Sequence, residues 1–171
     1  MATTTPTASG TTKAQPGKKA PAFSLNDQTG AKHALKDYAG HKLVLFFYPK
    51  DNTSGCTKEA CGFNDDLKKF EKAGAKVLGI SILDEKSKAK FADKHGLTYP
   101  LLADSRTDDD GKPDPVVAAK YGVWVEKSMY GKTYMGIERT TFLIGEDGTI
   151  LQRWNKVKVP GHVDEVLEAV Y

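Results

Sequence analysis

The chain has 171 residues, 39% of them hydrophobic and 27% charged, and its formal net charge is +3. These values are ordinary for one globular domain with a sizeable core, and the small charge, spread over interspersed basic and acidic residues, gives no reason to expect a nucleic acid partner. The longest apolar run is about six residues, far fewer than the roughly 20 that cross a bilayer, so we expect neither a membrane partner nor a secretory signal.

The first 16 residues are rich in Thr, Ala and Ser and offer almost nothing to bury. This composition predicts a disordered tail over residues 1–16 and one folded domain over residues 17–171. A transit peptide is an alternative for the tail, but such peptides are usually rich in arginine, which this stretch lacks.

The folded part alternates between strand-like and helix-like segments. A continuous apolar run at residues 43–48 predicts a strand covered on both faces, and Gly74 and Gly96 are expected to end the first two helices. In chain order, the predicted elements are edge strands or turns at 22–25 and 32–35, a strand at 43–48, a helix at 55–70, a strand at 76–82, a helix at 85–95, a strand at 101–104, a helix at 116–121, strands at 139–144 and 149–154, and a helix at 163–170.

The order of these elements, β-α-β-α-β-α-β-β-α, predicts the class of fold. It indicates an α/β sandwich in which helices flank a central mixed sheet. The last two strands flank Glu146-Asp147-Gly148, which is typical of a tight turn, so we expect an antiparallel hairpin at the end of the sheet. A thioredoxin-like sandwich has this order of elements.

The segment 48–61, with the sequence YPKDNTSGCTKEAC, joins the buried strand to the first helix and holds both cysteines. A thiol at such a corner lies near backbone N–H groups and the positive end of the helix dipole, which lower the pKa of a thiol and favour the nucleophilic thiolate. Helical spacing places Cys56 on the apolar face and Cys61 on the polar side. In an intact helix their Cα atoms are more than roughly 7 Å apart, so a disulfide could form only if the first turns unwind.

Several kinds of site could use two cysteines at this spacing. A zinc site usually needs four ligands, and the four histidines are scattered without a paired spacing. A phosphatase-type loop would need an arginine soon after the nucleophile, where Gly62 and Phe63 stand. A redox pair remains, with two unrelated buried thiols as the structural alternative, and we expect no metal and no cofactor. Two cysteines are also too few for a secreted disulfide scaffold, which favours a cytoplasmic location.

The pattern Pro49-x-x-x-Thr53-x-x-Cys56 resembles the active-site motif of peroxiredoxins. The pattern Cys56-Thr-x-Glu-x-Cys61, together with the stretch 121–144 (YGVWVEKSMYGKTYMGIERTTFLI), is similar to the peroxiredoxin Q subfamily, which is also called bacterioferritin comigratory protein. The resemblance extends over residues 17–171. The positions that match catalytic or substrate-binding residues of the family are Pro49, Thr53, Gly55, Cys56, Glu59, Cys61 and Arg139.

The resemblance implies a thiol peroxidase that reduces hydrogen peroxide and organic hydroperoxides. Cys56 would be the peroxidatic cysteine, whose thiolate attacks a peroxide oxygen and becomes a sulfenic acid. Arg139 would favour the thiolate, and Glu59 would orient Arg139. Thr53 would hydrogen-bond the thiolate and the peroxide, and Pro49 would shield the sulfur from water. Backbone N–H groups around positions 55 and 56 would stabilise the charge on the leaving oxygen.

The resemblance also implies a resolving cysteine at Cys61, which would attack the sulfenic acid of Cys56 and form an intramolecular disulfide in an atypical two-cysteine cycle. Other members of the subfamily carry a resolving thiol in the next helix, near Ala92, where this chain has none. Thioredoxin or a glutaredoxin-like protein would reduce the disulfide. Because the pair lies in one chain, we expect a monomer.

Two other functions fit the same fold. A thioredoxin-like disulfide reductase would carry Cys-x-x-Cys, which this chain lacks, and a non-enzymatic redox sensor would use Cys56 only as a switch.

The segment 105–115 is longer and more acidic than is usual in the family. Arg106 and Val117 stand where a calcium-binding loop needs acidic ligands, so we expect a solvated loop there.

Overall fold

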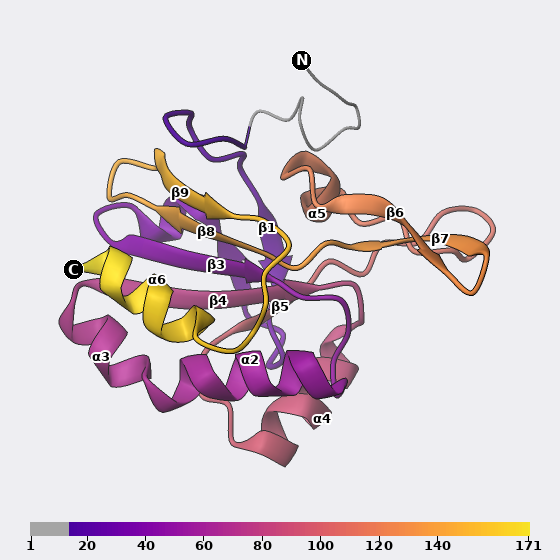
Figure 1. Ribbon diagram of the computed structural model, residues 1–171, viewed down its shortest axis with the longest axis horizontal. Coiled ribbons are helices and arrows are strands. Elements are labelled where there is room, and N and C mark those ends of the chain that lie inside the picture. Colours follow the sequence, from indigo (N-terminus) through magenta and orange to yellow (C-terminus); the bar gives the residue numbers. More distant parts are fainter. Residues whose placement is uncertain (1–13) are drawn as a thin grey trace.

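The computed structural model of the chain describes residues 14–171, which form a mixed sheet with helices on both faces (Figure 1). The elements are β1 (Ser24–Asn26), β2 (Lys32–Ala34), the 3-10 helix η1 (Leu35–Tyr38), β3 (Lys42–Phe47), α2 (Ser54–Asp65), α3 (Leu67–Lys72), β4 (Ala75–Ser81), α4 (Glu85–His95), β5 (Leu101–Ala103), α5 (Val116–Lys120), β6 (Trp124–Met129), β7 (Lys132–Ile137), β8 (Thr140–Ile144), β9 (Ile150–Trp154) and α6 (His162–Val170).

The central sheet has the strand order β5-β4-β3-β8-β9. Strands β3, β4 and β5 are parallel to one another, whereas β8 runs antiparallel to both of its neighbours, β3 and β9. The predicted α/β sandwich with a central mixed sheet is therefore confirmed, as is the antiparallel hairpin of β8 and β9. No helix among residues 14–171 has both the length and the apolar character that crossing a bilayer requires.

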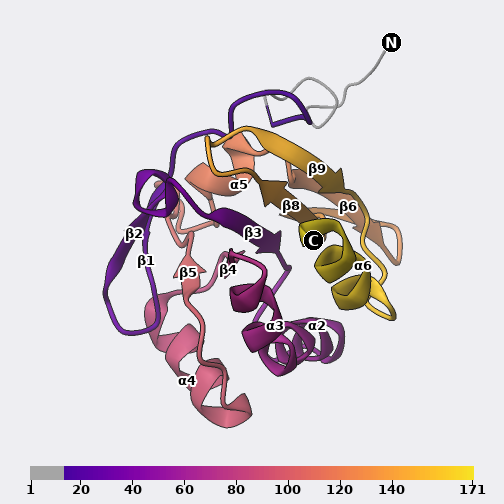
Figure 2. The same ribbon diagram turned by 90° about the vertical axis from the view of Figure 1, so that its left-hand side faces the viewer.

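Strand β3 lies in the middle of the sheet and separates two hydrophobic cores. Leu43, Leu45 and Phe47 point into the core on the side of α5. Val44 and Phe46 point into the other core, which is covered by α2, α3, α4 and α6 (Figure 2). All five side chains are at most 1% exposed, so the prediction of a strand covered on both faces is confirmed.

The single helix predicted at 55–70 is wrong, because the structure has two helices there. They meet at Asp66, whose φ of −100° and ψ of 10° leave the helical region. The change of direction buries Phe70 completely, with its ring centroid 5.7 Å from that of Phe63 in α2. Tertiary packing thus ends the helix at a position where the sequence has no glycine or proline.

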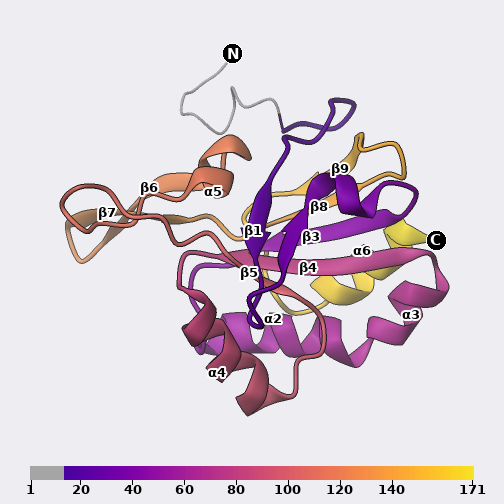
Figure 3. The same ribbon diagram turned by 180° about the vertical axis from the view of Figure 1, so that it is seen from behind.

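Strands β6 and β7 form a hairpin that was not among the predicted elements. It extends away from the central sheet as a separate two-stranded ribbon (Figure 3). Its turn is at Tyr130 and Gly131, where φ is 53° and 76°, in the left-handed region. The strands are mostly exposed, and the chain that leaves β7 leads directly to Arg139.

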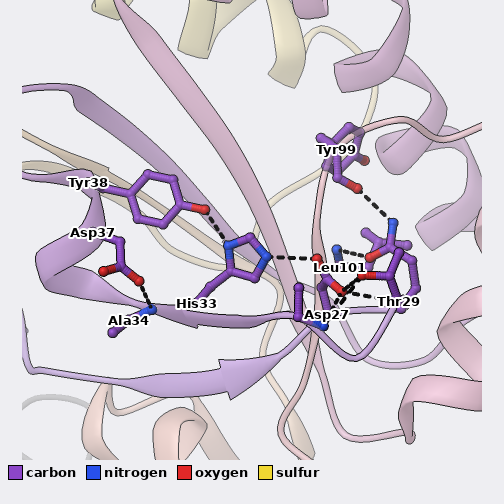
Figure 4. A network of polar contacts seen from close by, with 10 residues as sticks. Asp27, Thr29, His33, Ala34, Asp37, Tyr38, Tyr99 and Leu101 are labelled. Atoms are coloured by element: carbon purple, nitrogen blue, oxygen red, sulfur yellow. Dashed lines mark hydrogen bonds and ion pairs between the residues drawn. The ribbon is translucent and has the colours of Figure 1, made fainter.

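The two short segments predicted at the start of the domain form the hairpin β1–β2, which lies outside the central sheet. Within it, Oδ2 of Asp27 is 2.7 Å from Nε2 of His33 (Figure 4). The side chain of Gln28 accepts a hydrogen bond from the N–H of Leu101 at 2.8 Å and donates one to the carbonyl of Tyr99 at 3.0 Å. The hairpin is thereby fastened to the chain that enters β5.

The packed part of the chain begins earlier than the predicted boundary at residue 17. Of the predicted tail, residues 1–13 lie outside the described residues. Ala14 is fully buried, and its carbonyl accepts a hydrogen bond from Nη1 of Arg153 at 2.9 Å. The N–H of Gly17 then donates to the carbonyl of Ile150 at 2.8 Å, so the chain runs beside β9 from Ala14 onward.

The acidic segment 105–115 is an exposed loop, as its composition predicts. Residues 106–113 are all exposed. Oδ1 of Asp108 accepts hydrogen bonds from the N–H groups of Asp110 and Lys112, each at 2.9 Å, which closes the turn of the loop.

Candidate active site

Cys56 lies in the first turn of α2, directly after the loop that follows β3. Thr53 is the N-cap, with extended backbone angles, and its carbonyl accepts the first helical hydrogen bond, from the N–H of Thr57 at 2.8 Å. The first N–H groups of a helix have no acceptor within it, so this end of α2 favours negative charge. The Cys56 side chain is fully buried against the apolar core beneath α2, as its helical spacing predicts.

Arg139 reaches this corner from the short link between β7 and β8. Its Nη2 atom donates a hydrogen bond to Sγ of Cys56 at 3.2 Å, and its Nη1 atom donates to Oε1 of Glu59 at 2.6 Å. The Arg139 side chain is 17% exposed and that of Glu59 is fully buried. One guanidinium therefore contacts both the sulfur of Cys56 and the carboxylate of Glu59, which are three residues apart in α2.

The electrostatic state of this group follows from its burial. Burial raises the pKa of Glu59 to about 7, although the charge of Arg139 and its hydrogen bond act in the opposite direction. Burial alone would lower the pKa of Arg139, but Glu59 and Cys56 outweigh it and raise this pKa. Oε2 of Glu59 is buried without a hydrogen-bond partner. Arg139 thus stays a cation, and Glu59 can exchange a proton near neutral pH.

The structure does not bring the Thr53 hydroxyl to the sulfur. This hydroxyl is exposed and donates to the carbonyl of Lys50 at 3.1 Å, so the expected hydrogen bond to Cys56 is absent from this conformation. Pro49 is half-buried at the end of β3. Gly55 lies against Arg139, since a Cβ atom at this position would be 3.2 Å from Nη2.

Cys61 lies further along α2 and is half-buried, but it packs against the core beneath the helix, which differs from its predicted place on the polar side. Burial, with a further contribution from Asp65, raises the pKa of its thiol. Both cysteines are free thiols in this structure. The hydroxyl of Tyr99 donates to the carbonyl of Ala60 at 2.8 Å and holds the helix beside Cys61.

Two residues near the site were not among the predicted ones. Burial and the charge of Arg139 lower the pKa of Lys127 on β6, while Glu138 and Cys56 oppose this change, so the ammonium group lies within the field of the site. Lys127 belongs to the stretch that carries the resemblance, which is the signal that could have found it. Asp51 lies in the loop before α2 and is 7% exposed, although its polarity and its position after Lys50 favour a solvated residue.

Within residues 14–171, no group of three or more His, Cys, Asp and Glu side chains is arranged to hold a metal ion. The reactive groups gathered at this corner are the thiol of Cys56, the guanidinium of Arg139 and the carboxylate of Glu59.

Comparison with known proteins identifies relatives of the whole folded region. The AhpC/TSA family matches residues 16–153. The chain is 50% identical to the putative peroxiredoxin bcp of Coxiella burnetii over 151 residues, which are 88% of this chain and 95% of that protein. It is 43% identical to peroxiredoxin Bcp of Escherichia coli K12 over 151 residues, which are 88% and 92% of the two chains.

A solved structure of the Xanthomonas campestris bacterioferritin comigratory protein, described in terms of its alkyl peroxide reduction activity, superposes with a TM-score of 0.77. The two sequences are 44% identical, and the match covers 86% of this chain and 89% of that one. This likeness confirms the thioredoxin-like fold that the order of elements predicts.

Proposed function

Since the chain belongs to the AhpC/TSA family and is a thiol peroxidase of the peroxiredoxin Q (Bcp) kind, we propose that Cys56 and Cys61 carry its reaction through an atypical two-cysteine cycle. The substrates are hydrogen peroxide and organic hydroperoxides. The alkyl peroxide reduction ascribed to the Xanthomonas campestris relative supports the second class.

The first step is attack of the Cys56 thiolate on one oxygen of the peroxide. The O–O bond breaks, a sulfenic acid forms on Cys56, and the other oxygen takes a proton and leaves as water or an alcohol. Arg139 supports this step because its Nη2 atom is 3.2 Å from the sulfur, where it can stabilise the thiolate and donate to the peroxide. This contact, braced by Glu59 on the other side of the guanidinium, is the observation that carries the proposal.

The remaining matched positions are proposed to complete the substrate site. Pro49 shields the sulfur from water, and the N–H groups around Gly55 stabilise the leaving oxygen. Thr53 turns its hydroxyl from Lys50 toward the peroxide when substrate binds, a rotation about one side-chain bond.

The second step uses Cys61, which attacks the sulfenic acid of Cys56. The S–S bond forms, and the hydroxyl of the sulfenic acid leaves as water with the proton of the Cys61 thiol. An intact helix keeps the two thiols apart, so the first turns of α2 unwind in this step. A dithiol protein, thioredoxin or a glutaredoxin-like protein, then reduces the disulfide by exchange. A monomer in the cytoplasm suffices for this cycle, because both thiols belong to one chain.

The proposal is tested by adding one equivalent of hydrogen peroxide and identifying the cross-linked peptides by mass spectrometry. We expect a link between residues 56 and 61, no peroxide consumption by Cys56→Ser, and a single turnover that ends at a sulfenic acid in Cys61→Ser. Wild-type peroxide consumption by Cys56→Ser would overturn the assignment of the peroxidatic cysteine. Reduction of insulin disulfides without peroxide turnover would indicate a disulfide reductase, and one oxidation without turnover in the presence of a thioredoxin system would indicate a sensor.

A further inference from the structure

A buried ion pair joins the loop before Cys56 to helix α4. Nζ of Lys88 is 3.4 Å from each carboxylate oxygen of Asp51, and the two side chains are 0% and 1% exposed. Lysine and aspartate side chains are almost never fully buried unless they are paired, so the burial of each of these two side chains depends on the other.

Other polar groups complete the environment of the pair. The hydroxyl of Tyr48 donates to Oδ1 of Asp51 at 2.6 Å, and the hydroxyl of Ser87 donates to Oδ2 at 2.7 Å. Nζ of Lys88 donates to the hydroxyl of Ser81 at 2.6 Å and lies 5.5 Å from the centre of the Tyr48 ring. The pair therefore ties together the ends of β3 and β4, the loop between β3 and α2, and the first turn of α4.

The ion pair holds the loop 49–53, which contains a backbone conformation that is unfavourable by itself. Asp51 lies between Pro49 and Thr53, the two loop residues of the peroxiredoxin motif. The next residue, Asn52, has a φ of 63°, in the left-handed region that residues other than glycine seldom adopt. Such a conformation persists where the surrounding structure fixes it, and Asp51 is the buried side chain beside it.

We propose that Lys88 and Asp51 are positioning residues of the peroxidase reaction, which hold the loop 49–53 in the shape that sets Pro49 and Thr53 around Cys56. The inference rests on the proposed role of Cys56 as the peroxidatic cysteine. It does not depend on Cys61, because the loop acts in the first step.

The pH dependence of the reaction rate distinguishes a positioning role of Lys88 from a role in stability alone. Burial lowers the pKa of Lys88 to about 8, although Asp51, Asp84 and Asp104 oppose this change. Lys88 in the unfolded chain keeps its proton up to its ordinary pKa of 10.5. Between these two values the unfolded chain binds more protons, so the contribution of Lys88 to folding stability rises with pH. The same titration removes the charge that attracts Asp51. A positioning role therefore predicts a slower reaction above pH 8 without a loss of stability from this group.

The experiment measures the rate of Cys56 oxidation by hydrogen peroxide between pH 6 and 10 in the Cys61→Ser background, where only the first step occurs. With Lys88 present, we expect the rate to fall as pH rises through about 8. Lys88→Met should be slow at every pH, about ten- to a hundredfold below its parent at pH 7, and should lack this decline. The exposed Lys90 on the same helix supplies the matched control, and Lys90→Met should keep both the rate and the decline.

A second variant covers the case in which Lys88→Met does not fold, because that change leaves Asp51 charged and unpaired in the interior. Asp51→Asn/Lys88→Met has no unpaired buried charge, and it is expected to fold and to remain slow. A wild-type oxidation rate in either folded variant, or a rate that stays constant through pH 8 with Lys88 present, would overturn the inference. If Cys56→Ser still consumes peroxide, the proposed function fails first, and that result is distinct from any of these.

Discussion

Gly55 lies directly against the guanidinium of Arg139, so closely that a Cβ atom at position 55 would be 3.2 Å from Nη2. Nη2 is the atom that donates to Sγ of Cys56. A side chain at this position would therefore move the guanidinium by a few tenths of an ångström and lengthen its contact with the sulfur.

Gly55→Ala is accordingly expected to separate stability from activity. Gly55 is helical and has no positive φ, so alanine should stabilise the helix by about 0.5–1 kcal/mol. The rate of Cys56 oxidation should nevertheless fall, and stopped-flow kinetics with hydrogen peroxide beside thermal unfolding would show both effects. Ser54→Ala, in the same turn but exposed, is the control that should leave the rate unchanged. An unaltered rate in Gly55→Ala would mean that the contact with Nη2 has no part in catalysis.

Arg139→Lys should slow the oxidation of Cys56 by about a hundredfold. The guanidinium reaches Cys56 and Glu59 with two different nitrogen atoms, whereas an ammonium is a single point charge that cannot hold both partners in this geometry. The second-order rate constant with hydrogen peroxide measures the effect. Arg106→Lys changes an exposed arginine that is paired with Asp114, and it should behave as wild type. Equal rates for the two variants would contradict the role given to Arg139.

Glu59 should make the protein less stable as pH rises from 4.5 to 7. Its pKa is about 7 in the fold, against 4.5 as the ordinary value, so the folded state holds a proton that the unfolded chain has released between these pH values. The two pKa values differ by about 2.5, which corresponds to roughly 3–4 kcal/mol of stability that is present below pH 4.5 and is lost as pH rises to 7.

Denaturant unfolding of the wild type and of Glu59→Gln across this range checks the prediction. The glutamine cannot titrate but still offers an oxygen to Arg139, so the difference in unfolding free energy between the two proteins should change with pH. Glu71→Gln removes an exposed carboxylate of α3 and should leave the pH dependence as it is. Parallel curves for the wild type and Glu59→Gln would refute the assignment.

Local sequence patterns predicted those elements whose signals are themselves local. Helix α4 has the predicted bounds, because Asp84 caps its start by accepting a hydrogen bond from the N–H of Ser87 at 2.9 Å, and Gly96 ends it in the left-handed conformation. The hairpin β6–β7 could not be found in this way. Its strands are largely exposed, so they lack the alternation of buried and polar residues that marks a strand.

The residues of the site likewise divide into those that local sequence patterns predict and those that they do not. That Cys56 sits at a strand-to-helix corner follows from the sequence between β3 and α2. Arg139 and Cys56 are 83 positions apart in the chain. Only the resemblance to a family implied their contact, because no periodicity in the sequence brings the two residues together. Lys88 gave no signal at all, since a lysine in a short polar helix is expected to be solvated. Its burial depends on Asp51, which is 37 residues earlier, and on the ends of two strands.

Tyr99→Phe should speed the formation of the Cys56–Cys61 disulfide after peroxide oxidation. The Tyr99 hydroxyl donates to the carbonyl of Ala60 at 2.8 Å, one residue before Cys61, and the carbonyl of Tyr99 itself accepts a hydrogen bond from Gln28 at 3.0 Å. Loss of this hydrogen bond should weaken the middle of α2 by about 1 kcal/mol and make its unwinding more frequent.

Quenched-flow trapping of the sulfenic acid and the disulfide gives the rate of the second step, and hydrogen exchange of residues 54–62 reports the unwinding. Exchange should be faster in the disulfide form than in the dithiol form, and faster in reduced Tyr99→Phe than in reduced wild type. Tyr134→Phe removes a hydroxyl from an exposed strand of the hairpin and should change neither quantity. If Tyr99→Phe forms the disulfide at the wild-type rate although its α2 exchanges faster, unwinding of this helix does not limit the attack of Cys61 on the sulfenic acid.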